Sequence, residues 1–296
     1  MRVTAILLIL LLPALLFGGG SKEVGDRRPV VAVSILPQAF FVDSIAGDHV
    51  EVVTLVGEGQ NPHSYEPSPS QMALLAKASV WLLSGTDFEV ALRPKVAKLY
   101  PNLKIVDTTE GMQLRLLEED DDHDHDHQHL PSADGLNIDR HSWLGHAQSQ
   151  ILLSHTAKEL TAIVPSYASD IAHNAASLAD EIDNTFALLQ EELAPLKGQS
   201  VFVYHPSFGY FLDSFGMVQE AVETGGKEPT ARDLQRLILL AQEKGARAIF
   251  VQKQFPASSA QRVAQAVGAR VIPLDPLAYQ WLENIRLMGA ALKESL

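Results

Sequence analysis

The sequence contains no cysteine in its 296 residues. This absence excludes a lipid-modified N-terminal cysteine and thiolate ligands for a metal ion. It says nothing about export, because an oxidising compartment permits disulfides without requiring them. Basic residues are also scarce: 23 Lys and Arg against 36 Asp and Glu give a formal net charge of −13. Nucleic acid and anionic membrane surfaces are therefore poor partners for this chain.

Long apolar runs are absent except near the N-terminus. There, Arg2 precedes the apolar residues 5–17, and the small residues 18–21 follow. This order predicts a signal peptide over residues 1–20, followed by a linker over residues 21–28. The apolar segment is too short to cross a bilayer comfortably, and no later one reaches about 18 residues. We expect the mature protein to be free in the periplasm or an equivalent compartment.

From residue 30 onward, short β-rich apolar runs alternate with helical patterns. Residues 30–35 form a continuous apolar run, which is typical of a strand covered on both faces. Ser68, Pro69 and Gln71 have the order of an N-cap, a first-turn proline and a capping-box partner, so a helix is expected to begin there. This alternation predicts a parallel sheet flanked by helices. It restarts at residue 200, and the chain length suggests two domains with separate cores.

A polar tract and a helical region separate the two α/β halves. The tract at residues 112–138 is too long for a plain connection and is predicted to be a disordered loop. The helical pattern over residues 166–193 would span roughly 42 Å at 1.5 Å per residue. We therefore predict an α/β fold of two lobes joined by one long rigid helix. The N-terminal lobe is assigned to residues 29–165, the linking helix to 166–195 and the C-terminal lobe to 196–296.

Four potential metal ligands occupy related positions in this pattern. His63 lies in the loop after the second strand, His205 directly follows a strand, and Asp275 closely follows another. His141 lies where the long loop joins a helix. In open α/β sheets, ligands bind beyond the carboxyl ends of the strands, so two facing lobes would let all four side chains converge.

Three imidazoles and one carboxylate suit tetrahedral Zn²⁺. The set is too rich in nitrogen for Mg²⁺ or Ca²⁺, and Mn²⁺ lies below Zn²⁺ in the usual order of affinity. Taken singly, each histidine is more often a structural residue, and Asp275 with Pro276 also fits an ordinary turn. His49, His155 and His173 are expected on the surface or within helices rather than at a metal.

Short segments around the candidate ligands carry a resemblance to a known family. They are residues 61–69 (NPHSYEPSP), 140–144 (RHSWL), 204–211 (YHPSFGYF) and 274–277 (LDPL). In this order they resemble the ligand motifs of the metal-binding periplasmic solute-binding proteins of ABC transporters, the ZnuA/TroA-like zinc and manganese family. The resemblance covers essentially the whole mature chain. It implies two lobes, a rigid linking helix and one metal ion held by His63, His141, His205 and Asp275.

The chain also departs from the pattern of that family. The second motif usually reads Asp-Pro-His-x-Trp-Leu, and Arg140 stands here in place of the proline. Gly145 and His146 replace the usual pair after it, which makes His146 an alternative or auxiliary ligand, ranked behind His141. Gln252 stands where the family often has Glu. In the family, a histidine at the third ligand position accompanies zinc and a glutamate accompanies manganese, so His205 implies zinc, with manganese as the alternative.

A second metal-binding feature is predicted in the acidic, histidine-rich run at residues 118–129. It lacks apolar residues and is therefore expected to be disordered. Alternating imidazoles and carboxylates predict an auxiliary, weaker metal-binding loop, which we favour over a solvated loop with no metal role. The candidate ligands are His123, His125, His127, His129, Asp122, Asp124 and Asp126.

These observations predict a protein that captures Zn²⁺ and delivers it to an ABC permease with its cytoplasmic ATPase. We expect a monomer without an organic cofactor or catalytic activity, which a periplasmic zinc chaperone could load. A zinc hydrolase is the first alternative from another class, but the chain has no His-Glu-x-x-His motif and no glutamate assignable as general base. A passive metal buffer or an adhesin is the second.

Overall fold

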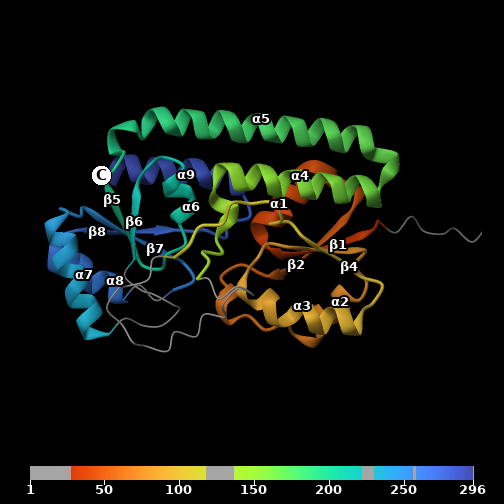
Figure 1. The fold of residues 1–296 in the computed structure, drawn as a ribbon, viewed down its shortest axis with the longest axis horizontal. Helices are drawn as coiled ribbons and strands as arrows, with labels where there is room; N and C mark the ends of the chain where they lie inside the picture. The colour runs from red at the N-terminus through yellow and green to blue at the C-terminus, as the bar shows by residue number, and fades with distance from the viewer. Residues whose placement is uncertain (1–27, 118–136, 222–229, 256–257, 296) are drawn as a thin grey trace, which may run out of the picture.

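The computed structural model describes residues 28–117, 137–221, 230–255 and 258–295. Within them the chain forms two four-stranded sheets in which all strand pairs are parallel. Helices cover both faces of each sheet (Figure 1). The predicted α/β class, with two lobes and a long linking helix, is confirmed.

The first sheet has the order β2-β1-β3-β4. Helices α1, α4 and α5 lie on one side of it, and α2 and α3 lie on the other (Figure 1). Its strands are β1 (Val30–Ile35), β2 (Glu51–Val56), β3 (Val80–Leu83) and β4 (Lys104–Asp107). The helices are α1 (Leu36–Ala46), α2 (Pro69–Leu75), α3 (Asp87–Leu99), α4 (His146–Ile163) and α5 (Ala168–Glu192). Ser68 caps α2 in a capping box with Gln71, as predicted.

The second sheet repeats this topology with the order β6-β5-β7-β8. Its strands are β5 (Ser200–Val203), β6 (Val218–Ala221), β7 (Ala248–Gln252) and β8 (Arg270–Leu274). Its helices are α6 (Gly209–Asp213), α7 (Ala231–Glu243), α8 (Ser258–Val267) and α9 (Trp281–Ser295). In each sheet the first strand lies between the two that follow it, so the strand order reverses there. Such reversals place ligand crevices beyond the carboxyl ends of the strands.

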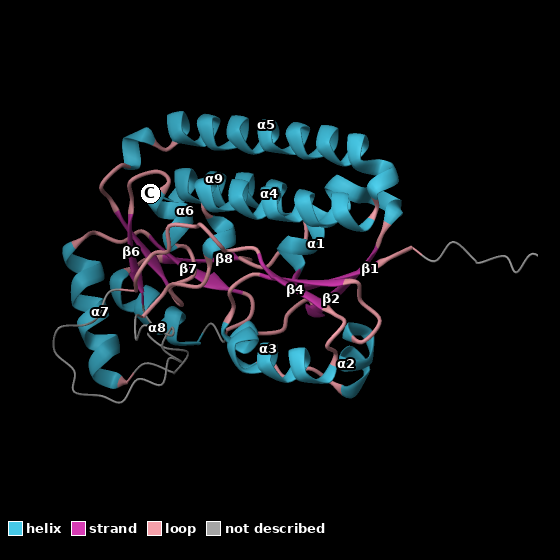
Figure 2. Cartoon of the chain, turned by 45° about the vertical axis from the view of Figure 1, so that its right-hand side comes forward, coloured by secondary structure: helices cyan, strands magenta, loops and turns pink. Residues whose placement is uncertain are grey.

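Helix α5 runs along one side of the molecule over both sheets (Figures 1 and 2). At about 1.5 Å per residue it is about 38 Å long. Its buried residues Ile171, Leu178, Ile182, Phe186 and Leu189 recur at helical spacing, which gives one apolar stripe facing the protein. This stripe packs on α1 and α4 in the first lobe and on α9 in the second. The helix is shorter than predicted because 3₁₀ turns at Pro165–Tyr167 and Ala194–Leu196 occupy its two ends.

The largest hydrophobic core is shared between the lobes, contrary to the expectation of two separate cores. Trp281 of α9 is fully buried, and its ring centroid lies 4.9 Å from that of Phe41 in α1. Its indole Nε1 donates a hydrogen bond to the carbonyl of Trp143 (2.9 Å), and Trp143 Nε1 donates to the carbonyl of Pro276 (2.7 Å). A second cluster around Leu237 lies wholly in the C-terminal lobe.

The two ends of the predicted disordered tract 112–138 are ordered and pair with each other. Leu116 and Ile138 form an antiparallel bridge, and Leu117 N donates to the carbonyl of Asn137 (2.9 Å). The disorder prediction is therefore wrong for both ends. Residues 118–136 lie outside the described part of the chain. None of the helices in the described part is both long and apolar enough to span a membrane.

Candidate metal centre

His63 is held at the carboxyl end of β2 by a short capped turn. Pro62 opens the 3₁₀ turn Pro62–Ser64, where its fixed φ suits the first position. The side chain of Asn61 accepts a hydrogen bond from the backbone N–H of His63 at 2.9 Å. The imidazole Nδ1 lies 2.6 Å from Oδ2 of Asp87, the first residue of α3. His63 thus comes from one loop of the N-terminal sheet and is oriented by the next.

His141 is held by a carboxylate two residues before it. One oxygen of Asp139 accepts the backbone N–H of His141 (3.0 Å) and lies 2.8 Å from its Nδ1. Asp139 is fully buried and His141 is 8% exposed. Because an ionised carboxylate only accepts hydrogen bonds, the proton is assigned to Nδ1 in both His63 and His141. Each Nε2 is therefore unprotonated, and its lone pair can bind a metal ion.

His205 follows β5 and is fixed by an amide side chain. Gln252, at the end of β7, accepts the backbone N–H of His205 at 3.2 Å. Its Nε2 donates to the carbonyl of His205 and to Oγ of Ser207, the latter at 2.7 Å. The His205 ring also stacks on Phe255, with centroids 4.7 Å apart. Both amide ends of Gln252 are therefore used to hold this loop.

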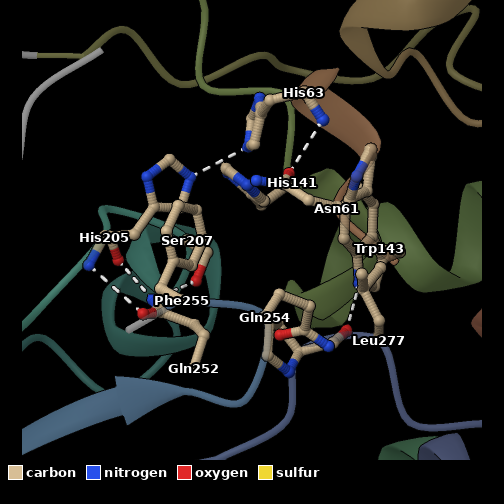
Figure 3. A pocket seen from close by; sticks show the side chains of 12 residues that line it. Asn61, His63, His141, Trp143, His205, Ser207, Gln252, Gln254, Phe255 and Leu277 are labelled. Carbon is tan, nitrogen blue, oxygen red and sulfur yellow. Dashed lines mark hydrogen bonds between the residues drawn. The ribbon is translucent and has the colours of Figure 1, made fainter. Parts of the chain in front are cut away.

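The three imidazoles converge, as Figure 3 shows. The candidate ligand atoms of His63, His141 and His205 all lie within 4.8 Å of one another. The two Nε2 atoms of His63 and His205 are 2.9 Å apart. Around a tetrahedral zinc ion with nitrogen ligands at 2.0–2.1 Å, neighbouring nitrogens would lie about 3.3 Å apart. The observed spacing therefore fits a single cation.

A small cavity of about 20 Å³ adjoins these rings, with room for an ion or a water molecule. Trp143, Gln254 and Leu277 contribute to its wall. The side-chain oxygen Oε1 of Gln254 is buried and has no hydrogen-bond partner among the described residues. A buried acceptor without a partner is costly, so a cation, or a water molecule bound to it, suits this position.

Asp275 does not join the three histidines. Its Oδ1 accepts hydrogen bonds from Gln254 Nε2 (2.9 Å) and from the backbone N–H of Leu277 (3.0 Å). Its Oδ2 lies 3.6 Å from Nζ of Lys253. The hydrogen bond to Leu277 closes an Asx turn, the structural role that its sequence context also suggested. Its role as a ligand remains a prediction.

The remaining histidines of the described chain lie elsewhere. His146 begins α4, where its Nε2 is 2.7 Å from Asp183 Oδ1 and its ring stacks on Phe186 at 4.6 Å; the structure does not bring it to the cluster. His49 stacks on Tyr167, His155 contacts the carbonyl of Glu110, and His173 is exposed on α5. The candidate ligands of the histidine-rich run (His123, His125, His127, His129, Asp122, Asp124 and Asp126) lie outside the described residues.

Sequence reasoning missed Asp87 as part of this centre, although a signal existed. Asp87 lies just beyond the carboxyl end of β3, next to the strand-order reversal that also located the histidines. Burial raises the pKa of Asp87, but the hydrogen bond with His63 and electrostatic attraction to His63, Arg140 and His141 bring this pKa below its ordinary value. Arg140 Nε lies 2.7 Å from Asp87 Oδ1, so the residue that departs from the family motif contacts the partner of a candidate ligand.

Comparison with known proteins agrees with this architecture. Residues 31–295 match the family model described as ZnuA, the periplasmic zinc-uptake complex component A. A crystal structure of a ZnuA deletion mutant with zinc bound superimposes with a TM-score of 0.81 at 30% identity, covering 90% of this chain and 97% of the other.

Two sequence relatives carry different metals in their names. The high-affinity zinc uptake system protein ZnuA of Brucella abortus is 26% identical, with 94% of each chain covered. The manganese-binding lipoprotein MntA of Bacillus subtilis is 23% identical, over 84% of this chain and 80% of its own. The fold and these similarities define a two-lobed solute-binding protein of the metal-binding class. The chain belongs to the family of the periplasmic zinc-uptake complex component A.

Proposed function

We propose that the protein captures Zn²⁺ outside the cytoplasm and delivers it to the membrane permease of an ABC importer, which a cytoplasmic ATPase drives. The convergence of His63, His141 and His205 on one small cavity carries the proposal. The first and last of these are separated by 142 positions in the sequence. They leave loops of different lobes, so one ion would be bound by both lobes together. A site of this kind can respond to lobe movement when the permease docks.

Asp275 is proposed as the fourth ligand. Its neighbours Pro276 and Leu277 line the same cavity, and its carboxylate would complete a three-nitrogen, one-oxygen zinc site. Asp275→Asn tests this assignment, with a loss of zinc affinity of about 10-fold or more expected for a lost ligand. Unchanged affinity would leave the site with three protein ligands.

Zinc is proposed over manganese because the converging atoms are imidazole nitrogens, which suit Zn²⁺ better than Mn²⁺. Manganese is the second candidate, since MntA is among the relatives. Metal analysis of the purified protein, followed by competition titrations against a chelator, distinguishes the two. We expect one tightly bound Zn²⁺ per chain and weaker binding of Mn²⁺. The reverse order of affinities would overturn the zinc assignment.

The ligand set is tested by His205→Ala, which should lower zinc affinity by at least about 100-fold, since a three-nitrogen site would lose one of its ligands. His173→Ala, on the exposed side of α5, is the matched control and should leave the affinity unchanged. In cells grown with a chelator, the wild-type protein should restore growth of a deletion strain and His205→Ala should not. A passive buffer or an adhesin predicts no such dependence.

Further parts of the proposal concern the whole chain. We propose export to the periplasm by residues 1–20, and lobes over residues 29–165 and 196–296 joined by a linker over 166–195. We also propose that the protein acts as a monomer, without an organic cofactor or catalysis, and receives zinc with help from a periplasmic chaperone. The match to a zinc-uptake component, a class of proteins that bind and deliver a solute, supports a non-catalytic site. Turnover of an ester by the zinc-loaded protein would contradict it.

A further inference from the structure

Three carboxylates belong to the centre. Two contact histidines of the cluster, and the third is the proposed fourth ligand. Each of them has a basic partner. The pairs are Asp87 with Arg140, Asp139 with Arg115, and Asp275 with Lys253. Their N–O distances are 2.7, 3.6 and 3.6 Å respectively. Arg115 is shared with Asp213, whose Oδ2 lies 3.1 Å from its Nε. Neutral imidazoles add no charge, so these described side chains, Asp213 included, together carry a net charge of −1. A dication entering this centre therefore meets an excess of only one negative charge.

The pair of Asp87 with Arg140 is the shortest of the three, and Asp87 lies 2.6 Å from Nδ1 of His63. The side chain of Arg140 is 16% exposed and that of Asp87 is 22% exposed. Arg140 Nη1 also donates to the carbonyl of Gly85 at 3.0 Å, which fixes the guanidinium in place. Arg140 lines a small pocket together with His63 and His141. It is thus a fixed, partly dehydrated positive charge in the wall of the centre.

This arrangement opposes cation binding in two ways. A carboxylate that accepts a hydrogen bond from a metal-ligating histidine makes the imidazole a better donor to the metal. The guanidinium on the other oxygen of Asp87 withdraws charge from that carboxylate. In addition, its own positive charge repels the dication, and partial burial leaves this repulsion less screened than at the surface.

We propose that Arg140 sets the affinity of the centre, holding zinc binding below the tightest value that the histidines would give and so speeding release. The inference rests on the proposed zinc-binding function. It gives a physical role to the residue at which this chain departs from the family motif. Lys253, beside Asp275, contributes in the same sense but less, because its side chain is 62% exposed and its charge is screened by water.

The experiment compares three variants by chelator competition for the affinity and by stopped-flow transfer of zinc to a chelator for the release rate. Arg140→Gln removes the charge and keeps a hydrogen-bond donor, and we expect about 10-fold tighter binding and correspondingly slower release. Arg140→Lys retains the charge and should stay within about 3-fold of the wild type. Arg93→Gln, on the exposed side of α3, is the matched control for removal of a surface charge and should behave as the wild type.

Unchanged or weaker zinc binding by folded Arg140→Gln would overturn the inference. Folding is checked by thermal melting of the chelator-treated proteins. If Arg140→Gln fails to fold, Lys253→Gln provides the test, since this exposed side chain is dispensable for packing. Zinc binding that is about 2-fold tighter in Lys253→Gln supports the inference. Unchanged zinc binding overturns it. A wild-type protein that bound no zinc would instead overturn the proposed function itself.

Discussion

The two halves of the candidate centre hold their histidines by different chemistry. On the N-terminal side, the carboxylates of Asp87 and Asp139 contact the imidazoles directly. On the C-terminal side, the neutral amide of Gln252 holds the backbone of His205. Hydrogen bonds to charged groups are roughly twice as strong as those between neutral groups. The N-terminal half therefore holds its histidines more firmly, and we expect the C-terminal half to release zinc first.

The largest effect is expected from a substitution in the hydrophobic core that the two lobes share. Trp281 is fully buried between the lobes, and Trp281→Ala should lower the free energy of unfolding by about 3–5 kcal/mol. Urea denaturation followed by circular dichroism measures this. Leu287→Ala, at a position of α9 that is 57% exposed, is the control and should cost less than about 0.5 kcal/mol. If Trp281→Ala unfolded in two separate steps, the halves would be independent units.

The carboxylate-held half is tested next by Asp139→Asn. This change weakens the hold on both the backbone and the ring of His141, and we expect zinc affinity to fall by about 10–100-fold. Chelator competition measures the effect, with Asp180→Asn on the exposed side of α5 as the control. A loss smaller than about 2-fold would show that the carboxylate is dispensable and that the two halves do not differ in the way described.

The amide-held half should be more tolerant. Gln252→Leu keeps the volume of the side chain and removes its hydrogen bonds to His205 and Ser207, and we expect zinc affinity to fall by only about 3–10-fold, or about 1 kcal/mol. The same titration applies, with Gln261→Leu on the exposed face of α8 as the control. A loss equal to that of Asp139→Asn would contradict the comparison.

The smallest effect on the tight site is expected from deleting residues 118–129, which belong to neither half. A run of histidines and carboxylates that is predicted to be disordered would lose ordering entropy when it binds metal, so it should bind zinc more weakly than the cluster. The deletion should lower the number of zinc ions bound per chain and change the tight affinity by less than about 2-fold. Isothermal titration measures both. Loss of the tight site would make this run the primary one.

The sequence was informative wherever a local pattern determined the structure. The apolar runs predicted the strands, and Ser68 with Gln71 predicted the beginning of α2 because a capping box is a contact within one helical turn. His63 and His205 could be located because the carboxyl ends of parallel strands lie at one edge of a sheet. Such rules place residues at an edge without stating which side chains touch.

Contacts between distant segments were beyond the reach of these patterns. The pairing of Asp87 with His63 joins residues 24 apart, and that of Gln252 with His205 joins residues 47 apart. No periodicity encodes such pairs, since they depend on how loops from different strands meet. For the same reason the sequence did not reveal that Gln254 binds the carboxylate of Asp275. Nor did it reveal that both lobes share one core, which depends on the packing of α9 against α1.

The indole of Trp143 has a practical consequence. Its ring centroid lies 5.5 Å from that of His141, and it borders the cavity. The other two tryptophans of the chain, Trp81 and Trp281, are buried in the core and do not line the cavity. Light emitted by Trp143 should therefore change when an ion arrives beside its neighbouring imidazole, and the protein would report its own loading without an attached dye.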